Sequence, residues 1–400
     1  MGLILFSFLL TLDDALTRLK EQSYDASLYL IQMKIQQKTY SMGYSNLFPS
    51  ISSSGSKTTS YPGGYDTYSI RFNFDQNLSI DNWLNGVNTH FKNSETYYTY
   101  LDNLSNLMLT AVNDYMDAYV TKRLLDVRKK ALKRTGYYKE KIDEMLRLGS
   151  ASKADLLKAE VSWYQAQIDL ERARKAYREA LLTLKYLLKI DTSDSLELTA
   201  PIPETKALPL DTLKSIAYRE RPDIRALHEK LVSLRIDLAS NLSSYLPSIN
   251  FSGSYGYSGS DIPETKDEWD AGDSYSFTLS LSLPLFTGFN RVNNTIIKKL
   301  QIQMAEFELE KKKNQIDIEV EDAYYSLKEA EKMLKLARKN LELAKESSEA
   351  SRLRYELGEA SIIELLSGEE DLLNAEYSYE SAVKDYIVSI YRLKKVIGRL

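Results

Sequence analysis

Apolar residues along this chain follow two spacings, and each spacing predicts a different kind of element. Intervals of three and four residues, as at Leu327, Ala330 and Leu334, place one apolar stripe on a helix whose other faces are charged. Residues 289–357 contain neither glycine nor proline. The pattern therefore predicts one uninterrupted helix there, roughly 100 Å long at a rise of about 1.5 Å per residue. A second long helix is predicted over residues 82–148.

An interval of two residues predicts strands in four places. Ile70, Phe72 and Phe74 alternate with polar residues, and Ile249 and Phe251 do the same further along. The run 50–57 is rich in serine, and its alternation of apolar and polar residues is the weakest of the four. The predicted strands are 50–57, 68–77, 248–257 and 275–285.

The chain repeats itself once. Pro49-Ser50-Ile51 recurs as Pro247-Ser248-Ile249, an offset of 247 − 49 = 198 positions. Leu148-Gly149 recurs as Leu357-Gly358, an offset of 357 − 148 = 209 positions. The offset changes once, where the second copy carries an extra polar loop around residues 261–270. A register that holds, steps in a loop and holds again indicates duplication.

The repeat divides the chain into four segments. Each copy is predicted as a helix, two strands, a very long helix and a last helix. The segments are 1–10, an apolar arm or signal-peptide remnant; 11–190, the first repeat; 191–209, a linker with three prolines; and 210–400, the second repeat.

The first helix of each copy has recognisable signals at its ends. Thr11 is a candidate N-cap for a helix predicted over residues 12–46, with acids in its first turn. In the second copy, Arg221-Pro222 is expected to kink the corresponding helix or to restart it.

The beginning of the chain allows two interpretations. Gly2 to Leu10 has the length of the apolar part of a signal peptide, but no Lys or Arg precedes it and no small-residue cleavage motif follows. A truncated signal is the preferred interpretation, and a buried apolar arm is the alternative. No run of about 18 apolar residues predicts a transmembrane helix.

Composition excludes several classes of function. The formal net charge is −4, and Lys and Arg are interspersed with acids, so there is no electrostatic footprint for nucleic acid. There is no cysteine, and His90 and His228 stand alone without metal-site spacing. No catalytic constellation, metal site or cofactor motif is apparent, so we do not expect an enzyme.

The four strands carry an argument about assembly. Each has about the length, 9–11 residues, that crosses a bilayer as a tilted strand. Four strands in lipid would leave edge N–H and C=O groups unpaired, at several kcal/mol each. The chain is therefore expected to share a barrel with identical copies, and three copies would supply twelve strands. The alternative is a non-membrane structural coiled-coil interaction protein with soluble strands.

Several short motifs occur in order along the chain. They are Leu12-Asp13-Asp14-Ala15-Leu16, Leu246-Pro247-Ser248-Ile249, Leu283-Pro284-Leu285-Phe286-Thr287-Gly288-Phe289, Leu148-Gly149-Ser150-Ala151-Ser152 and Leu357-Gly358-Glu359-Ala360-Ser361. Together they resemble the TolC-type outer-membrane factors, the exit ducts of tripartite efflux pumps and type I secretion systems. The resemblance covers residues 11–400.

This resemblance implies a mainly α fold with a small β part. It implies a homotrimer with a twelve-stranded outer-membrane β-barrel, continued by a long periplasmic α-barrel in a Gram-negative-type bacterium. An equatorial belt would come from residues 191–211. The expected partners are outer-membrane lipid, a periplasmic adaptor and an inner-membrane pump that supplies the energy. A periplasmic adaptor of the same pumps is a further alternative, but the Gly- and Val-rich section of adaptors is absent.

The resemblance also implies two kinds of site. The turns that follow the long helices are expected to meet the adaptor, with Gly149 and Gly358 in the positive-φ conformation that ends a helix sharply. The expected docking residues are Arg147, Leu148, Gly149, Ser150, Ala151, Ser152, Glu356, Leu357, Gly358, Glu359, Ala360 and Ser361. The alternative interpretation is that these residues only cap helices.

The second expected site is a pore gate. The protein after which the family is named carries an acidic ring near this tip. By position after the tip glycine, its two acids fall on Glu364 and Ser367, with Asp155 as the matching acid of the first copy. Three copies of Glu364 around an opening would attract cations. A solvated helix-face acid is the alternative, and the serine leaves open whether divalent cations bind. The cargo and the pump class (RND, ABC or MFS type) stay open.

Overall fold

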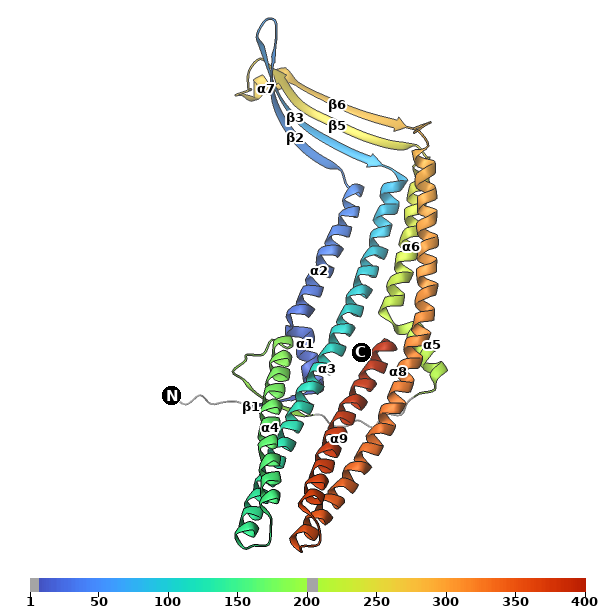
Figure 1. The fold of residues 1–400 in the computed structure, drawn as a ribbon. Coiled ribbons are helices and arrows are strands. Elements are labelled where there is room, and N and C mark those ends of the chain that lie inside the picture. Colours follow the sequence, from blue (N-terminus) through green and yellow to red (C-terminus); the bar gives the residue numbers. More distant parts are fainter. Residues whose placement is uncertain (1–6, 200–207) are drawn as a thin grey trace. The chain divides into compact units, whose positions relative to one another are not determined.

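Figure 1 draws the chain as a computed structural model, and the described residues are 7–199 and 208–400. They form two compact units. Unit 1 comprises the described residues 7–30, 101–199, 208–221 and 314–400, and unit 2 comprises 31–100 and 222–313. The prediction of a mainly helical chain with a small sheet is confirmed.

The helices and strands have the following bounds. The helices are α1 (Leu12–Gln22), α2 (Tyr24–Ser41), the 3₁₀ helix η1 (Met42–Leu47), α3 (Ile80–Arg147), α4 (Lys153–Leu187), α5 (Leu210–Glu220), α6 (Pro222–Ser243), α7 (Lys266–Gly272), α8 (Asn290–Glu356) and α9 (Ile362–Val396). The strands are β1 (Ser7–Thr11), β2 (Ser50–Ser60), β3 (Tyr65–Leu78), β4 (Ser195–Thr199), β5 (Ser248–Gly259) and β6 (Asp273–Ser282).

The first helix begins as predicted but is not continuous. The Thr11 hydroxyl accepts a hydrogen bond from the Asp14 N–H at 3.1 Å, and the Asp14 carboxylate accepts from the Thr11 N–H at 3.3 Å, so Thr11 is an N-cap with a reciprocal box. The predicted helix 12–46 is interrupted at Ser23, which is buried and extended. It then ends as a 3₁₀ turn, η1.

The equivalent interruption in the second copy is the one that the sequence predicts. Arg221 is extended, and Pro222 is the first residue of α6. An N–H at the first helical position has no partner within the helix, so proline loses no hydrogen bond there. Ser23 and Arg221 differ by 198 positions, the repeat offset, so the first break could have been inferred from the second.

Unit 2 contains a four-stranded antiparallel sheet in the order β2-β3-β5-β6 (Figure 1). Among the described residues, β2 and β6 each have one neighbour, so each has an unpaired edge. Strand β6 ends at Ser282 instead of the predicted Leu285, because Pro284 has no N–H to continue the ladder. The turn between β5 and β6 holds α7, a helix that the polar loop did not predict.

The register of the sheet separates its side chains onto two faces. Phe74, Phe251 and Phe277 share one face, which we call the apolar face. The ring centroid of Phe251 lies 5.6 Å from that of Phe74 and 6.3 Å from that of Phe277. The opposite, polar face carries serine pairs across neighbouring strands, such as Ser56–Ser69 at 2.8 Å and Ser254–Ser276 at 2.9 Å. The apolar face is open: its outermost strand exposes Phe277 and Leu279 by 72% and 73%.

Four helices of unit 2 also form a row. Thr89 of α3 donates to the Tyr40 carbonyl oxygen of α2, and Ser240 of α6 donates to Asp81 of α3. Lys230 of α6 forms an ion pair with Glu308 of α8 at 2.8 Å. The row is therefore α2-α3-α6-α8, with α2 and α8 at its ends.

Both end helices expose apolar side chains at helical spacing. On α8 these side chains, the α8 stripe, are 48–62% exposed: Val292, Ile296, Leu300, Met304 and Phe307. On α2 and directly after it, the α2 stripe consists of Ile31, Ile35 and Met42. Nothing among the described residues of unit 2 covers either stripe.

Unit 1 contains a second, two-stranded sheet near its buried core. Strand β1 pairs with β4 in parallel, and Leu10 is 1% exposed. The Tyr115 hydroxyl of α3 lies 2.7 Å from the carbonyl oxygens of both Leu10 and Thr199, and accepts from the Thr199 N–H at 3.1 Å. Residues 7–10 are thus a strand, whereas residues 1–6 and the predicted linker prolines Pro201 and Pro203 lie outside the described residues.

Across the residues that the structure describes, we find no helix with the length and apolarity needed to cross a membrane.

Candidate functional site

The two helical turns of unit 1 have the same backbone structure. Gly149 and Gly358 both adopt φ = +79°, the left-handed conformation expected of them. The Gly149 N–H donates to the Leu146 carbonyl oxygen and the Gly358 N–H to that of Tyr355, each at 3.0 Å. The next N–H, of Ser150 or Glu359, reaches back five residues at 2.9 Å or 2.8 Å. Each long helix therefore ends in a Schellman motif.

Each turn presents a leucine to solvent immediately before its glycine. Leu148 is 82% exposed and Leu357 is 74% exposed. The residue before each leucine is charged and paired: Arg147 with Asp143 at 2.7 Å, and Glu356 with Lys141 of α3 at 3.2 Å. These leucines are apolar side chains that the chain itself leaves uncovered.

The remaining predicted docking residues cap the returning helices. Ser152 is the N-cap of α4 and Ser361 is the N-cap of α9. Ala151 and Ala360 pack from the two turns against one shared group of buried side chains.

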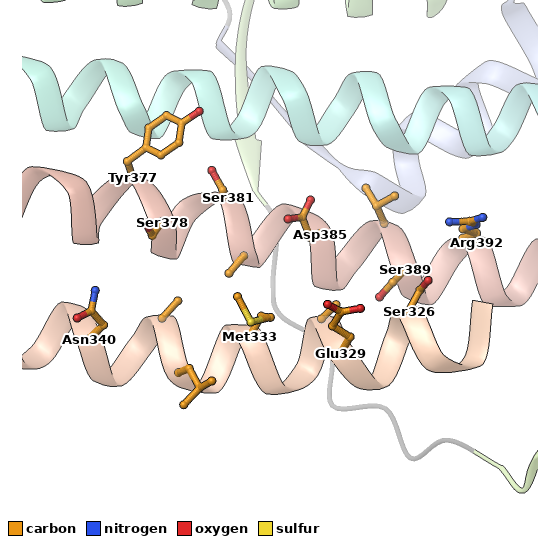
Figure 2. Close-up of a pocket in the computed structure, with 15 residues that line it drawn as sticks. Ser326, Glu329, Met333, Asn340, Tyr377, Ser378, Ser381, Asp385, Ser389 and Arg392 are labelled. Carbon is orange, nitrogen blue, oxygen red and sulfur yellow. The ribbon is translucent and has the colours of Figure 1, made fainter. Parts of the chain in front are cut away.

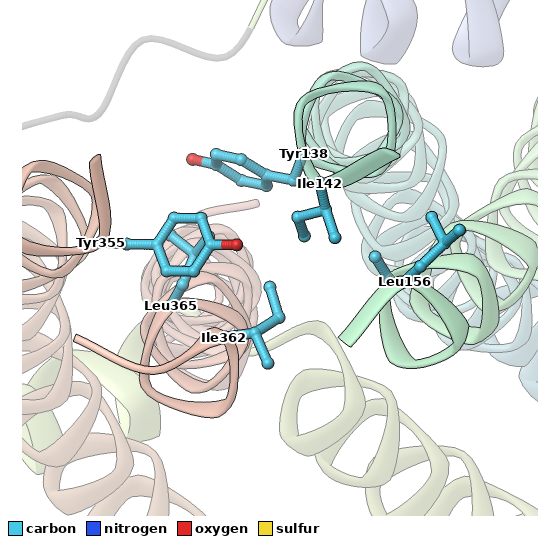
Figure 3. Close-up of a cluster of buried hydrophobic side chains, with 7 residues drawn as sticks. Tyr138, Ile142, Leu156, Tyr355, Ile362 and Leu365 are labelled. Carbon is cyan, nitrogen blue, oxygen red and sulfur yellow. The ribbon is translucent and has the colours of Figure 1, made fainter. Parts of the chain in front are cut away.

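That shared group, the tip core, joins the two helical hairpins (Figure 3). Ile142 of α3 and Leu365 of α9 are both 0% exposed within it. Its buried members are Tyr138, Ile142, Leu156, Ala159, Tyr355, Ile362 and Leu365. Because all four helices contribute, neither hairpin has an independent core at this end.

Asp155, a predicted gate acid, is used by its own helix. Its carboxylate accepts from the Ser152 N–H at 3.2 Å and from the Ser152 hydroxyl at 2.6 Å, while its own N–H donates to that hydroxyl oxygen at 3.1 Å. The hydrogen bonds from Ser152 lower the pKa of Asp155 below its ordinary value. The carboxylate stays ionised at neutral pH, and the charge stabilises the first turn of α4.

Glu364 occupies the matching position of α9 but has a different partner. Its N–H donates to the Ser361 hydroxyl at 3.2 Å, as in the first copy. Its carboxylate instead accepts from the guanidinium of Arg354 on α8. Ser367 lies one turn further on, exposed, on the wall of a groove between α4 and α9. The geometry thus gives the three predicted gate residues three different surroundings.

A buried ionic cluster lies next to these positions, and sequence reasoning did not find it. Glu369 is 9% exposed and forms an ion pair with Arg134 at 2.5 Å. Its carboxylate accepts from the Tyr138 hydroxyl at 3.0 Å and the Ser348 hydroxyl at 3.2 Å. Burial, and then the Glu369 charge, raise the pKa of Tyr138. Arg134 and Tyr138 are one helical turn apart, which is the only local signal of the cluster.

An open groove of about 780 Å³ lies between α8 and α9 (Figure 2). Small side chains line much of it, including Ala330, Ala337, Ser381 and Ala382. Arg392 at one end is paired with Asp322 at 2.7 Å. The groove has no cluster of catalytic groups. In the described part of the chain, no group of three or more His, Cys, Asp or Glu side chains is arranged to hold a metal ion.

Comparison with known proteins gives one family. Residues 213–399 match the family model described as outer membrane efflux protein. The chain is 23% identical over 357 residues to the outer membrane protein TolC of Vibrio cholerae, covering 85% of this chain and 78% of that protein. It is 22% identical over 370 residues to the toxin and drug export protein A of Aggregatibacter actinomycetemcomitans, covering 88% and 80%.

A solved structure shares the fold over almost the whole chain. The CmeC outer membrane channel of Campylobacter jejuni superposes with a TM-score of 0.84 at 18% identity, covering 97% of this chain and 85% of that chain.

Proposed function

We propose that this chain belongs to the outer membrane efflux protein family, whose model matches residues 213–399, and that it is the exit duct of a tripartite efflux pump or type I secretion system. In this role it conducts substrates passively from the periplasm across the outer membrane. Members of this family are channel proteins, not enzymes, so the energy for transport has to come from another component.

The two-faced sheet with two unpaired edges is the observation that carries the proposal. The strands have 10–14 residues, long enough to cross a bilayer at a tilt. One face is apolar and open, as lipid requires, and the other is small and polar, as a water-filled lumen requires. A non-membrane coiled-coil protein would leave that apolar face in water, so this alternative is disfavoured.

Closure of the edges favours a ring of identical copies. The unpaired edge of β2 has a different sequence from that of β6, and the α2 stripe differs from the α8 stripe. A head-to-tail contact would join β6 and α8 of one copy to β2 and α2 of the next. Three copies give twelve strands, an even number within the range of bacterial barrels. We therefore propose a homotrimer with a twelve-stranded barrel, continued by a helical barrel in the periplasm.

We propose that the two turns dock a periplasmic adaptor, which in turn joins an inner-membrane pump. Leu148 and Leu357 offer matching apolar contacts, and the tip core beneath them holds both turns in position. The remaining docking residues are the ten others between Arg147 and Ser152 and between Glu356 and Ser361.

The gate proposal centres on Glu364. Three copies would place carboxylates around the opening, with Ser367 further along α9 and Asp155 on the matching helix. The positive charge of Arg354 offsets part of the Glu364 charge. Removing that positive charge by Arg354→Gln is therefore expected to increase the cation preference in single-channel recordings. Glu364→Gln is expected to decrease it, and unchanged selectivity in both variants would exclude a gate role.

The repeat supports one more proposal, that residues 11–190 and 210–400 are duplicated halves joined by 191–209. Each half contains two strands, one helix of 68 or 67 residues and one returning helix of 35 residues.

The decisive experiment measures location and mass. The chain is expressed with an N-terminal signal peptide, and the inner and outer membranes are separated. The molar mass of the detergent-extracted protein is then measured by light scattering. We expect outer-membrane material with the mass of three copies. Leu300→Glu in the α8 stripe is expected to yield monomers, because it puts a charge where a neighbour packs. Lys299→Glu, on the same helix but at a polar position, is the matched control. A wild-type chain that is monomeric and soluble without detergent would refute the proposal.

A further inference from the structure

The polar face of the sheet is almost uncharged. Across its four strands the positions on this face are occupied by Ser, Thr, Asn and Gly, with Tyr65 at the start of β3. The exceptions are Arg71 and Asp75, both exposed and both on β3. A charge in such surroundings dominates the local potential, because its nearest neighbours across the strands on this face are uncharged.

Arg71 stands among small neighbours. Ser54 of β2 and Gly256 of β5 are directly opposite it in the register. A Cβ atom at Gly256 would lie 2.3 Å from the Ile70 carbonyl oxygen and 2.8 Å from the Arg71 Cα, so a side chain does not fit there. The glycine lets β3 and β5 approach closely and leaves one side of the guanidinium open. Within the described sheet and helices Arg71 forms no ion pair, and arginine keeps its charge at any physiological pH.

Asp75 is separate from Arg71. The two residues are four positions apart on one strand, about 13 Å, which is beyond a direct ion pair and exceeds the Debye length of about 8 Å at physiological salt. The neighbours of Asp75 in the register are Ser50 and Ser252, which carry no charge. Because β3 leads into α3, Asp75 lies nearer the helical end of the sheet than Arg71 does.

We propose that Arg71 forms an anion-attracting ring inside the β-lumen and that Asp75 forms an opposing, cation-attracting ring nearer the helices. This inference rests on the proposed function, because the rings require three copies with their polar faces inward. The class of solute that Arg71 favours is one with carboxylate, phosphate or other anionic groups.

The size of the lumen makes the charge effective. Twelve strands about 4.8 Å apart and tilted by about 40° give a wall roughly 24 Å across, so the axis lies about 12 Å from the backbone. An extended arginine side chain covers about half of that distance. The Debye length is about 10 Å at 0.1 M salt, so the potential of the ring extends over the whole cross-section.

Cysteine reactivity can measure this potential without interference from the gate. The chain has no cysteine, so one introduced thiol reports one position. Ser54→Cys reports the surroundings of Arg71, and Ser50→Cys reports those of Asp75; both serines are exposed and both are on β2. Each thiol is treated in isolated outer membranes with anionic and cationic methanethiosulfonate reagents of similar size. The ratio of the two reaction rates depends on the local potential.

We expect the anionic-to-cationic rate ratio to be higher for Ser54→Cys than for Ser50→Cys. Adding Arg71→Gln to Ser54→Cys should lower its ratio about threefold to fivefold in 0.1 M salt, as a unit charge roughly 6 Å away predicts. Arg71→Lys keeps the charge and should keep most of the ratio. Adding Asp75→Asn to Ser50→Cys should raise that ratio. A ratio for Ser54→Cys that is unchanged by Arg71→Gln overturns the inference.

A third thiol separates this inference from the proposed function. Leu279→Cys lies on the apolar face, 73% exposed in the single chain, and should be shielded by lipid from both reagents. If Leu279→Cys reacts as fast as Ser54→Cys, or if Ser54→Cys does not react, the proposed orientation of the barrel fails. If Ser54→Cys reacts and Leu279→Cys does not, but the rate ratio of Ser54→Cys is unchanged by Arg71→Gln, then only the proposed charge ring is refuted.

Discussion

The two tips of unit 1 have the same backbone and different electrostatics. Both turns are Schellman motifs, followed by a serine N-cap and an acid three residues later. In the first tip the acid is Asp155, whose short side chain returns to Ser152. In the second it is Glu364, which is one methylene longer and reaches Arg354 on the neighbouring helix instead. The position that matches Arg354 in the first tip is Met145, which carries no charge. A longer acid and a nearby arginine together therefore link two helices in the second tip.

The largest effect is expected from the core that both tips share. Leu365→Ala should destabilise both tips together by about 2–5 kcal/mol, because Leu365 is 0% exposed between the hairpins. Hydrogen exchange of the amides in both turns, measured by mass spectrometry on the detergent-extracted chain, checks this. Ile363→Ala, two residues away and 60% exposed, is the control and should change protection little. Loss of protection in the second tip alone would show that the hairpins are independent.

The glycines should give equal effects in the two tips. At φ = +79° with nothing within 4 Å of an added Cβ, Gly149→Ala and Gly358→Ala introduce only backbone strain, about 1–2 kcal/mol each. The same exchange measurement applies. Asparagine tolerates this conformation better, so Gly149→Asn and Gly358→Asn should recover part of the loss. Unequal losses would mean that the turns differ in more than their side chains.

The N-caps should behave differently. Ser152→Ala removes a reciprocal box and should destabilise the start of α4 by about 1 kcal/mol. Ser361→Ala removes a single hydrogen bond to the Glu364 N–H, so a smaller loss is expected in α9. Equal losses of exchange protection in the two helices would contradict the comparison.

The same box predicts a pH dependence for the first tip. Hydrogen bonds from Ser152 lower the pKa of Asp155, so its stabilisation is complete above the ordinary aspartate pKa of about 3.9 and is lost as the pH falls through the lower, folded value. Protection of the α4 start should therefore decline below about pH 4. The decline should be absent in Asp155→Asn, and its persistence there would assign it to another group.

The smallest effect on stability is expected from the ion pair of the second tip. Arg354→Gln should cost under about 1 kcal/mol, because both partners are about half exposed and an exposed pair is screened by salt. Raising the salt concentration should weaken the wild-type second tip and leave Arg354→Gln unaffected. A salt response of equal size in the variant would exclude the pair as its source.

Local sequence patterns predicted most of the fold and the positions of the turns. The long helices were predicted from apolar spacing and the scarcity of glycine and proline alone. The positive φ of Gly149 and Gly358 was predicted from the residue type and its position at a helix end. The break at Ser23 was missed because serine, unlike Pro222, does not exclude a helix. Strand β4 was missed because five residues with a partner elsewhere in the chain carry little periodicity.

Long-range partners were the part of the site that sequence could not supply. Glu369 and Tyr138 are 231 positions apart, and nothing in either neighbourhood identifies the other. Glu364 and Arg354 are on different helices joined by a turn, so their pairing depends on side-chain length and helix packing. A single sequence assigns residue types to positions, but such contacts follow only from the assembled helices.

The hydroxyl of Tyr115 has a consequence for the order of folding. It joins β1 to β4, and Ser7 pairs with Ser195, 195 − 7 = 188 positions later. The first strand therefore has no partner until nearly half of the polypeptide has been synthesised. Contacts over such separations form slowly, so unit 1 completes late and its early segments stay open for longer. For a chain that has to be threaded through a membrane before it assembles, delayed closure is an advantage.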